Sequence, residues 1–362
     1  MSSNKIVLLT SEFPPQPGGI GNHAYNLAEG LQGHNYKVTV ISDTRSKTGT
    51  PEKQFDKSCQ ATIVRISRKN LAVTYFKRIA VAFKYVKQND TLIASGKFSL
   101  WVGAFLSLFI SRKYIAIIHG SELQLGNQFL KIITNTALKQ FHTVIAVSNY
   151  TKSLVSQLQL NNIHVIHNGF TLQKPMAVAK KHKPLPVLIT VGNVTARKGQ
   201  HNVIKALPQL LKIYPDVQYH IVGIPTEKER LQKLALDLNV EQAVYYHGCV
   251  SEDEKIRLLQ QADVFMMLSE TTKTGDAEGF GIAILEANTL GIPAIGARNC
   301  GIEDAIKDKS SGRLIVHNDP LQCKEALGDI LEKYQTYANN ATSWSKQFSW
   351  DKVILKYLTH LQ

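Results

Sequence analysis

Short apolar runs rich in β-branched residues alternate with segments of helical periodicity along almost the whole chain. The predicted strands cover residues 5–10, 37–42, 61–66, 91–94, 114–118, 144–147 and 164–167, then 187–191, 218–222, 244–247, 264–268, 293–296 and 313–316. The helices predicted between them include residues 22–31, 71–87, 149–158, 202–213, 228–238 and 254–262. Because strands that alternate with helices form parallel sheets covered on both faces, the pattern predicts an α/β protein.

The alternation occurs twice, and 362 residues suit two domains of about 150 to 180 residues each. Residues 173–186 carry prolines and clustered charge without periodicity, which is typical of an interdomain linker. We therefore expect two Rossmann-like, doubly wound parallel-sheet domains, residues 1–172 and 187–344, that face each other across a cleft. Since ligands of such domains bind at the carboxyl ends of the strands, the cleft is the expected active site.

The formal net charge of +14 arises from the first half of the chain. Residues 1–184 contain 23 Lys and Arg against 7 Asp and Glu, whereas residues 185–362 contain 19 against 21. This asymmetry favours an anionic partner for the first domain. Basic and apolar side chains interleave over residues 68–87, which suits a helix on an anionic membrane surface and equally an amphipathic helix packed on a sheet. Nucleic acid is not an expected partner, because the sequence has no nucleic-acid-binding signature.

The sequence predicts a cytoplasmic protein, with peripheral attachment to the inner membrane face as an option. The apolar run at residues 100–110 is too short to span a bilayer, and the chain opens with a predicted strand instead of a secretion signal. No CxxC spacing links the four dispersed cysteines, so neither a zinc site nor a disulfide framework is expected; they are Cys59, Cys249, Cys300 and Cys323.

The segment Glu278-Gly279-Phe280-Gly281 lies between a predicted buried strand and the helical pattern of residues 282–290. Glycines at a helix start leave backbone N–H groups and the positive end of the helix dipole for an anion. Glu278 is expected at the mouth of this helix and Glu286 about 12 Å further along its axis. Two carboxylates in these positions suit the sugar and the ribose of a sugar nucleotide. Two ordinary surface glutamates beside a helix start are the alternative.

Two more glycine-rich junctions follow predicted strands. Residues 14–21 follow the first strand, where glycines allow close approach of the backbone to a phosphate. Residues 192–199 open the second domain and carry Arg197 and Lys198, a guanidinium fork and a point charge that suit a pyrophosphate. Exposed surface charge is the alternative interpretation of this pair. No DxD-type pair follows a strand, so we expect no metal.

His119 directly follows the predicted strand 114–118, so its side chain is expected at the carboxyl end of that strand, in the cleft. A hydrogen-bonded structural histidine is the more frequent outcome for such a position. No Ser-His-Asp, Cys-His or HExxH arrangement stands out in the sequence.

Taken together, these segments resemble the retaining glycosyltransferases of the family-4 type, also described as glycosyl transferases group 1, which have the GT-B architecture. The similarity covers nearly the whole chain. It rests on residues 17–23, 119–120, 147–150, 165–169, 192–199, 223, 248, 278–287, 291–293 and 312. The resemblance also implies that a final helix, residues 345–362, packs back on the first domain.

The resemblance implies transfer of a sugar, with retention, from a nucleotide-diphosphate sugar to an acceptor hydroxyl. UDP or GDP is the expected nucleotide, no other cofactor is expected, and the acceptor is expected to be a carbohydrate or a lipid-linked group in polysaccharide or glycolipid synthesis. The residues implied to bind the donor are Gly19, Arg197, Lys198, Phe280, Gly281 and Glu286. Those implied to be catalytic are His119, Glu278, Arg197 and Lys198.

Each implied role has a simple chemical content. Gly19 would offer its amide to the diphosphate, whose charge the Arg197 and Lys198 side chains would neutralise. Glu286 would accept hydrogen bonds from the ribose, and Glu278 would hold hydroxyls of the transferred sugar near the amides of Phe280 and Gly281. His119 would contact the sugar beside its anomeric carbon.

The chain departs from the family pattern in two places. Asn193 stands where an Arg is frequent, and residues 270–277 form a longer link beside the expected donor sugar, so the resemblance does not extend to the identity of that sugar. Two other functions remain open at this stage. They are a non-catalytic protein that binds sugar nucleotides or polyanions, and a sugar-nucleotide epimerase on the same fold.

Overall fold

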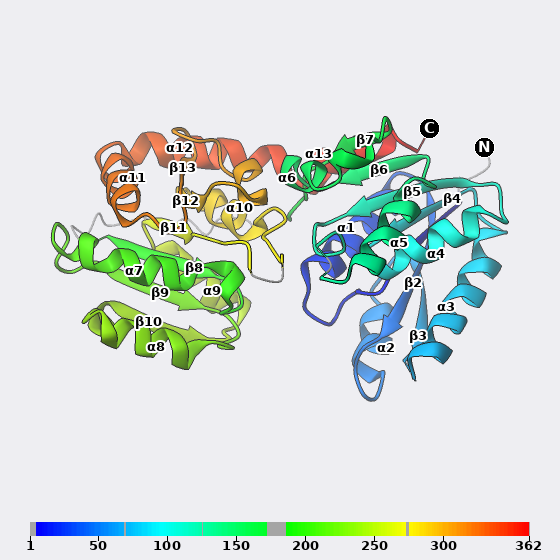
Figure 1. Cartoon of the computed structure of the whole chain (residues 1–362), viewed down its shortest axis with the longest axis horizontal. Coiled ribbons are helices and arrows are strands. Elements are labelled where there is room, and N and C mark those ends of the chain that lie inside the picture. The colour runs from blue at the N-terminus through cyan, green and yellow to red at the C-terminus, as the bar shows by residue number, and fades with distance from the viewer. Residues whose placement is uncertain (1–4, 69, 125, 172–185, 273–274, 362) are drawn as a thin grey trace. The chain divides into compact units, whose positions relative to one another are not determined.

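The computed structural model describes residues 5–68, 70–124, 126–171, 186–272 and 275–361. They form two compact units (Figure 1). Unit 1 consists of Met1–Gly169 and Trp350–Gln362, and unit 2 of Phe170–Ser349. The predicted linker, residues 173–186, lies outside the described residues except for Pro186.

Unit 1 is built on a seven-stranded parallel sheet, as far as its described residues show, with the strand order β3-β2-β1-β4-β5-β6-β7. The strands are β1 (Lys5–Thr10), β2 (Lys37–Thr44), β3 (Thr62–Ser67), β4 (Thr91–Ser95), β5 (Lys113–Ile118), β6 (Thr143–Ala146) and β7 (Ile163–Val165). The helices are α1 (Gly19–Gly33), α2 (Thr50–Asp56), α3 (Leu71–Val86), α4 (Lys97–Ser107), α5 (Gln128–Leu138), α6 (Asn149–Ser153) and α13 (Trp350–Leu358). The strand order reverses between β1 and β4, and such a reversal is where doubly wound sheets bind ligands.

Two apolar cores hold the layers of unit 1 together. Helices α3, α4 and α5 cover one face of the sheet, where residues such as Val86, Leu100 and Leu138 are fully buried. Helices α1 and α13 cover the other face, and Ile354 of α13 packs against α1. The last helix of the chain therefore belongs to the core of unit 1.

Unit 2 repeats the design with a parallel sheet of six described strands in the order β10-β9-β8-β11-β12-β13. The strands are β8 (Val187–Val191), β9 (Gln218–Val222), β10 (Val244–Gly248), β11 (Val264–Met267), β12 (Ala294–Ala297) and β13 (Gly312–Ile315). The α-helices are α7 (Gln200–Leu211), α8 (Lys228–Asp237), α9 (Glu252–Gln261), α10 (Ile282–Thr289), α11 (Pro320–Glu332) and α12 (Tyr334–Ser345). Its order reverses between β8 and β11.

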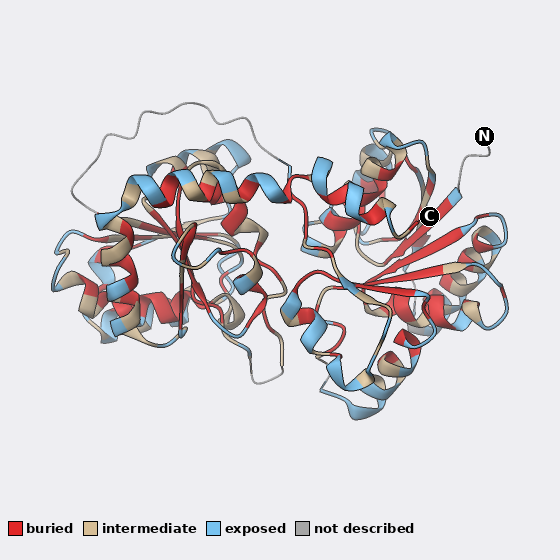
Figure 2. Ribbon diagram, turned by 90° about the horizontal axis from the view of Figure 1, so that it is seen from above, coloured by how far each residue is buried: buried red, intermediate tan, exposed pale blue. Residues whose placement is uncertain are grey.

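The burial pattern follows from this layering. Figure 2 shows buried residues along the strands of both sheets, whereas the outer sides of the helices are exposed. In unit 2, helices α7, α8 and α11 cover one face of the sheet, and α9 and α10 cover the other. Strands buried on both faces read as nearly continuous apolar runs, which is why the sequence identifies them so clearly.

The prediction of two doubly wound parallel sheets is confirmed. Every predicted strand is present, and no strand end differs from its predicted position by more than two residues. The predicted helix 149–158 is wrong in its second half, because α6 ends at Ser153 and a short 3₁₀ turn, Ser156–Leu158, ends at Gln159 in the left-handed conformation (φ 50°). No helix in the described part of the chain is both long and apolar enough to cross a bilayer.

Candidate active site

The predicted site residues are divided between the two units. Gly19 and His119 belong to unit 1, and all the others belong to unit 2. Those of unit 2 follow the carboxyl ends of β8 and β11 or lie in α10, which starts after the loop that follows β11. They therefore lie at the strand reversal of the unit 2 sheet, the edge at which a doubly wound fold binds its ligand.

Two glycines pack the loops of unit 2 tightly together. Gly199 has φ +72°, and a Cβ atom there would lie 1.8 Å from the carbonyl oxygen of Leu268, so only glycine fits where the loop after β8 meets the end of β11. Gly301 donates its N–H to the carbonyl oxygen of Glu278 at 2.8 Å, and a Cβ there would lie 2.0 Å from the oxygen of Gly279. The first contact joins the Arg197 loop to the end of β11, and the second joins the Glu278 loop to the segment after β12.

The two basic residues after β8 converge on one carboxylate. Lys198 Nζ lies 2.8 Å from Glu278 Oε2, and the guanidinium of Arg197 donates a hydrogen bond to the same oxygen. Arg197 Nε also lies 3.1 Å from Asp276. Two cations thus share two carboxylates, and the side chains of Lys198 and Glu278 are only 15% and 12% exposed. The alternative of a solvated surface pair does not fit this geometry, because both basic side chains are engaged by carboxylates and largely shielded from solvent.

The protonation state of Glu278 follows from these contacts. Burial by itself would raise the pKa of Glu278, but the ion pairs with Lys198 and Arg197 outweigh it and lower the pKa to about 2. Glu278 is therefore a carboxylate at any physiological pH. It can accept hydrogen bonds from hydroxyl groups but has no proton to donate.

Glu286 occupies a different environment on α10. Burial raises the pKa of its carboxyl group, although Lys255 Nζ lies 3.4 Å away and lowers it in part. The same ammonium group is 2.6 Å from Glu252 on α9. Lys198 also acts electrostatically on Glu286, so its charge is felt by both predicted glutamates.

The start of α10 follows directly on the Glu278 loop. Gly281 is its N-cap with φ +89°, and no side chain caps this helix end with a hydrogen bond. The Phe280 ring is buried against Phe348, with 5.7 Å between ring centroids, and fixes the chain just before the helix. Uncapped amides and the helix dipole at such a position favour an anionic or hydroxyl-rich group.

Sequence reasoning missed several charged neighbours in unit 2. Glu270 lies two residues beyond Leu268 and faces two histidines, His201 Nε2 at 3.2 Å and His317 Nε2 at 3.7 Å. Asn202 donates to Glu270 at 3.3 Å. The position of Glu270 just after a strand could have marked it as a site residue. Its partners could not be found in the same way, because they come from α7 and from the segment after β13. Within the described residues, no group of three or more His, Cys, Asp and Glu side chains is arranged to hold a metal ion.

In unit 1, His119 lies at the carboxyl end of β5, as predicted, and is half-buried. Its Nε2 atom is 2.9 Å from the hydroxyl of Ser95, the last residue of β4, and its ring packs edge-on against His23 of α1 at 5.1 Å. Burial lowers the pKa of His119 to about 4. His23 in turn lies 3.0 Å from the hydroxyl of Tyr357 in α13. His119 is therefore a neutral, hydrogen-bonded imidazole at pH 7.

Gly19 is the first residue of α1, directly after the loop that follows β1. It is exposed, and no atom beyond its chain neighbours lies within 4 Å of the place where its Cβ would be. The helix start is thus accessible to a ligand, and no side chain caps it with a hydrogen bond.

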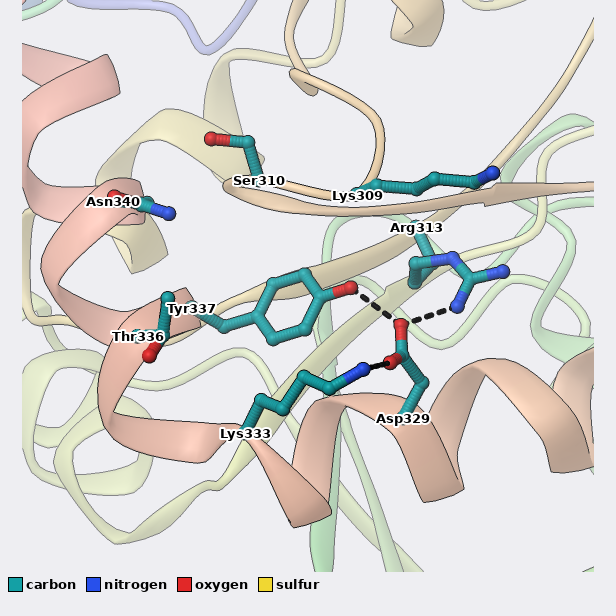
Figure 3. A pocket seen from close by; sticks show the side chains of 8 residues that line it. All are labelled: Lys309, Ser310, Arg313, Asp329, Lys333, Thr336, Tyr337 and Asn340. Carbon is teal, nitrogen blue, oxygen red and sulfur yellow. Dashed lines mark hydrogen bonds and ion pairs between the residues drawn. The ribbon is translucent and has the colours of Figure 1, made fainter.

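A separate cavity of about 370 Å³ in unit 2 contains none of the predicted site residues (Figure 3). Asp329 of α11 dominates it, accepting hydrogen bonds from the Tyr337 hydroxyl at 2.5 Å, from Lys333 at 2.9 Å and from Arg313. These donors come from β13, from α12 and from the residue between α11 and α12. Because one carboxylate accepts from all three donors, this cluster is best explained as a structural contact that connects α11, α12 and β13.

We expect the Glu278 ion pairs to stabilise the ligand-free fold in a pH-dependent way. The folded pKa lies below that of an unfolded glutamate, so the stabilisation is complete above about pH 5 and is lost as the pH falls toward 2. Glu278→Gln should lower the free energy of unfolding by about 2 kcal/mol at pH 7 and by clearly less at pH 3. Urea unfolding at both pH values measures this, with exposed Glu229→Gln as the control. An equal loss at pH 3 and pH 7 would contradict the ion-pair assignment.

Two family models and many known proteins match the chain. The model described as Glycosyltransferase Family 4 matches residues 17–174, and the one described as Glycosyl transferases group 1 matches residues 173–347. The GDP-mannose-dependent alpha-(1-6)-phosphatidylinositol monomannoside mannosyltransferase of Mycolicibacterium smegmatis is 26% identical, over 90% of this chain and 89% of the relative.

Solved structures resemble the whole chain in fold. The crystal structure of Anabaena Alr3699/HepE in complex with UDP and glucose has a TM-score of 0.79 and 20% identity over 99% of both chains. Sucrose-phosphate synthase from Thermosynechococcus elongatus has a TM-score of 0.79 and 18% identity, over 99% of this chain and 98% of that one. With two family models that together match residues 17–347, the chain belongs to the glycosyltransferases that these models describe, and its fold is GT-B.

Proposed function

We propose that this glycosyltransferase moves a sugar from a UDP- or GDP-sugar to an acceptor hydroxyl with retention of configuration and without a metal ion. The observation that carries the proposal is the convergence of Lys198 and Arg197 on Glu278 beside the uncapped start of α10. A leaving diphosphate needs fixed positive charge, and these two side chains supply it from a rigid loop.

The ligand-free cluster suggests how the donor binds. Arg197 and Lys198 are balanced by Glu278 and Asp276, so the four charged groups cancel one another. A diphosphate that takes over the two cations leaves the Glu278 carboxylate free to accept hydrogen bonds from hydroxyls of the sugar. Glu286, further along α10, is then placed for the ribose. Glu278 thus acts as a temporary partner that keeps the two cations in position.

The chemical step is a substitution at the anomeric carbon. The bond from that carbon to the diphosphate oxygen breaks, its electron pair stays on the phosphate, and an oxocarbenium-like centre develops. The acceptor hydroxyl attacks from the same face, forms the new C–O bond and gives its proton to the leaving phosphate. No protein base is required in this scheme, because the leaving phosphate itself accepts the proton.

Unit 1 is proposed to bind the acceptor and to contribute Gly19 and His119 to the reaction. The imidazole of His119 is neutral and fixed by Ser95, so it can position a hydroxyl without adding charge. A relative named for phosphatidylinositol mannoside mannosylation favours a lipid-linked or carbohydrate acceptor, in cell-surface glycolipid or polysaccharide synthesis. The relative named for GDP-mannose and the neighbour crystallised with UDP support GDP and UDP as the nucleotides to test.

Donor affinity should depend on Lys198. We expect Lys198→Ala to weaken binding of the preferred nucleoside diphosphate by about 10- to 100-fold, because a charge-assisted contact is lost. Thermal shift with UDP, GDP and ADP identifies the ligand, and calorimetry measures the change. Lys205→Ala removes an exposed charge from α7 and serves as the matched control. Glu278→Gln should bind the free diphosphate at least as tightly as the unmodified chain, since both cations remain.

Turnover separates an enzyme from a binding protein. Slow hydrolysis of the preferred UDP- or GDP-sugar should disappear in Lys198→Ala and in Glu278→Gln, and the product formed with an acceptor should keep the donor's anomeric configuration. Unchanged affinity in Lys198→Ala would reject the diphosphate assignment. Tight binding without hydrolysis or transfer would favour a non-catalytic sugar-nucleotide protein.

We also propose that unit 1 contacts an anionic membrane, from the cytoplasmic side, through α3, α4 and α5. On one face of the sheet, α4 contacts both α3 and α5. Large apolar side chains on them and just after α4 expose 45% to 74% of their surface: Phe76, Phe105, Leu108, Phe109, Phe129 and Ile132. Exposed basic residues accompany them: Lys84, Lys87, Arg112 and Lys131. Arg78, which the sequence suggested as part of this basic surface, is buried and paired with Asp43, so that assignment is wrong.

Binding to vesicles should need both charge and apolar contact. We expect the chain to sediment with anionic vesicles, more weakly as salt rises, because screening weakens the attraction of basic side chains to the surface. Leu108→Ser/Phe109→Ser should weaken binding at least about fivefold by removing inserted apolar area. The control Ile213→Ser/Leu236→Ser removes exposed apolar residues from unit 2. Equal binding to neutral vesicles would defeat the electrostatic part of the account.

A further inference from the structure

A second polar cavity, of about 470 Å³, lies in unit 1 at the carboxyl ends of β2 and β3. Eleven residues line it: Thr44, Arg45, Ser46, Lys47, Thr48, Gly49, Glu52, Lys53, Arg65, Ser67 and Arg68. Five of them are cationic and one is acidic. The strand end is the ligand-binding edge of this fold, and none of the residues predicted from the sequence to form the active site belongs to this cavity.

Two carboxylates, the buried Asp43 and the half-buried Asp56, hold two arginines of this cavity in place. Arg65 makes a forked contact with Asp56, with Nε at 3.1 and 3.2 Å from the two carboxylate oxygens, and donates to the carbonyl oxygen of Pro14 at 2.6 Å. Arg68 donates from Nε to Asp43 at 2.9 Å, while its side chain is 49% exposed. The Arg68 guanidinium is thus anchored at one nitrogen and accessible at the cavity. A fixed guanidinium loses little entropy when it binds an anion.

The one acidic residue in the lining is hydrogen-bonded to the loop after β2. Glu52 accepts hydrogen bonds from the N–H groups of Arg45 and Ser46, at 2.9 and 2.7 Å, and from the Ser46 hydroxyl. Burial would raise the pKa of Glu52, but these hydrogen bonds lower it to about 2. Its carboxylate therefore serves to fold the loop after β2, and it is already satisfied by that loop.

Positive charge remains in excess when the surroundings are included. Six cationic side chains, namely the five in the lining and Arg78, face four carboxylates: Asp43, Glu52, Asp56 and the more distant Glu12, 3.9 Å from Arg45. Two positive charges are left over. Lys47 and Lys53 are exposed and form no ion pair within the described residues, so they carry this excess.

We propose that this cavity binds a phosphate-bearing group of the acceptor, a phosphomonoester, phosphodiester or pyrophosphate, between Lys47, Lys53 and Arg68. Thr48 and Ser67 supply hydroxyl donors around the same space. Two or three cations with hydroxyl donors are the usual chemistry of phosphate recognition. That the group belongs to the acceptor rests on the proposed function, whereas binding of the anion does not. The phosphate can be that of a soluble sugar phosphate or of a lipid headgroup.

The test uses the full chain with Lys198→Ala, which weakens the competing phosphate contacts of unit 2. Inorganic pyrophosphate is titrated calorimetrically at low salt, and sedimentation is measured with phosphatidylcholine vesicles that contain phosphatidic acid. Adding Lys47→Gln/Lys53→Gln should weaken binding about tenfold or more, because two charge-assisted contacts are lost. The control Lys57→Gln/Lys139→Gln makes the same charge change at exposed sites of unit 1 outside the cavity. Since neither lysine pair forms an ion pair in the described structure, both double variants should fold.

Each outcome decides the proposal. If Lys47→Gln/Lys53→Gln loses binding to pyrophosphate but not to the vesicles, the site binds soluble phosphates. If it loses binding only to the vesicles, the site binds a lipid headgroup. No binding of either probe, unchanged binding in this variant, or an equal loss in the control overturns the cavity as a phosphate site. Donor hydrolysis is measured on the same variants with Lys198 intact. If hydrolysis is absent while the cavity binds pyrophosphate, the proposed function fails and the anion site stands.

Discussion

The placement of Lys198 and Arg197 against Glu278 is the interaction on which the rest of the structure's chemistry depends. It exists because the loop after β8 meets the end of β11 at Gly199, where any side chain would overlap the carbonyl oxygen of Leu268. This backbone contact fixes two long, flexible cationic side chains beside a carboxylate before any ligand arrives. Preorganised charge of this kind stabilises a departing diphosphate without rearrangement at the moment of reaction.

The two units use the same fold for different electrostatic purposes. In unit 2 the cations at the strand ends are matched by carboxylates, so the cluster is neutral. In unit 1 the strand ends keep an excess of positive charge around Arg68 and the two exposed lysines after β2. Part of the positive charge of the first half of the sequence therefore lies at the edge of the unit 1 sheet where ligands bind in this fold. A neutral donor cluster and a basic cavity suit a substrate pair in which the acceptor also carries negative charge.

Most of the fold could be predicted from the sequence because strands buried on both faces leave continuous apolar runs. Helices on the surface were harder to define. The segment 149–158 looks like one helix, yet the backbone turns left-handed at Gln159 after a short 3₁₀ turn. Arg78 looks like part of a solvated basic face, yet it is buried on Asp43. Periodicity reports which side of a helix is apolar but not which charge has a partner across the chain.

The candidate site could be predicted in part for the same reason. Glycines next to strand ends are visible in one segment of sequence, and they identified the loops of Arg197 and Glu278. Pairings such as Glu270 with His201 and His317, or Lys255 with Glu286, join segments that are far apart along the chain. No local pattern encodes them, because they follow from the order of strands in the sheet. The basic cavity of unit 1 was not predicted for a similar reason, because residues at the ends of both β2 and β3 line it.

A crystal structure of the chain with its preferred nucleoside diphosphate is the most direct test of the central claim. The account predicts the diphosphate oxygens within hydrogen-bonding distance of Lys198 and Arg197, the ribose at Glu286, and the Glu278 carboxylate released from both cations. A nucleotide bound elsewhere, with the Glu278 ion pairs intact, would contradict it.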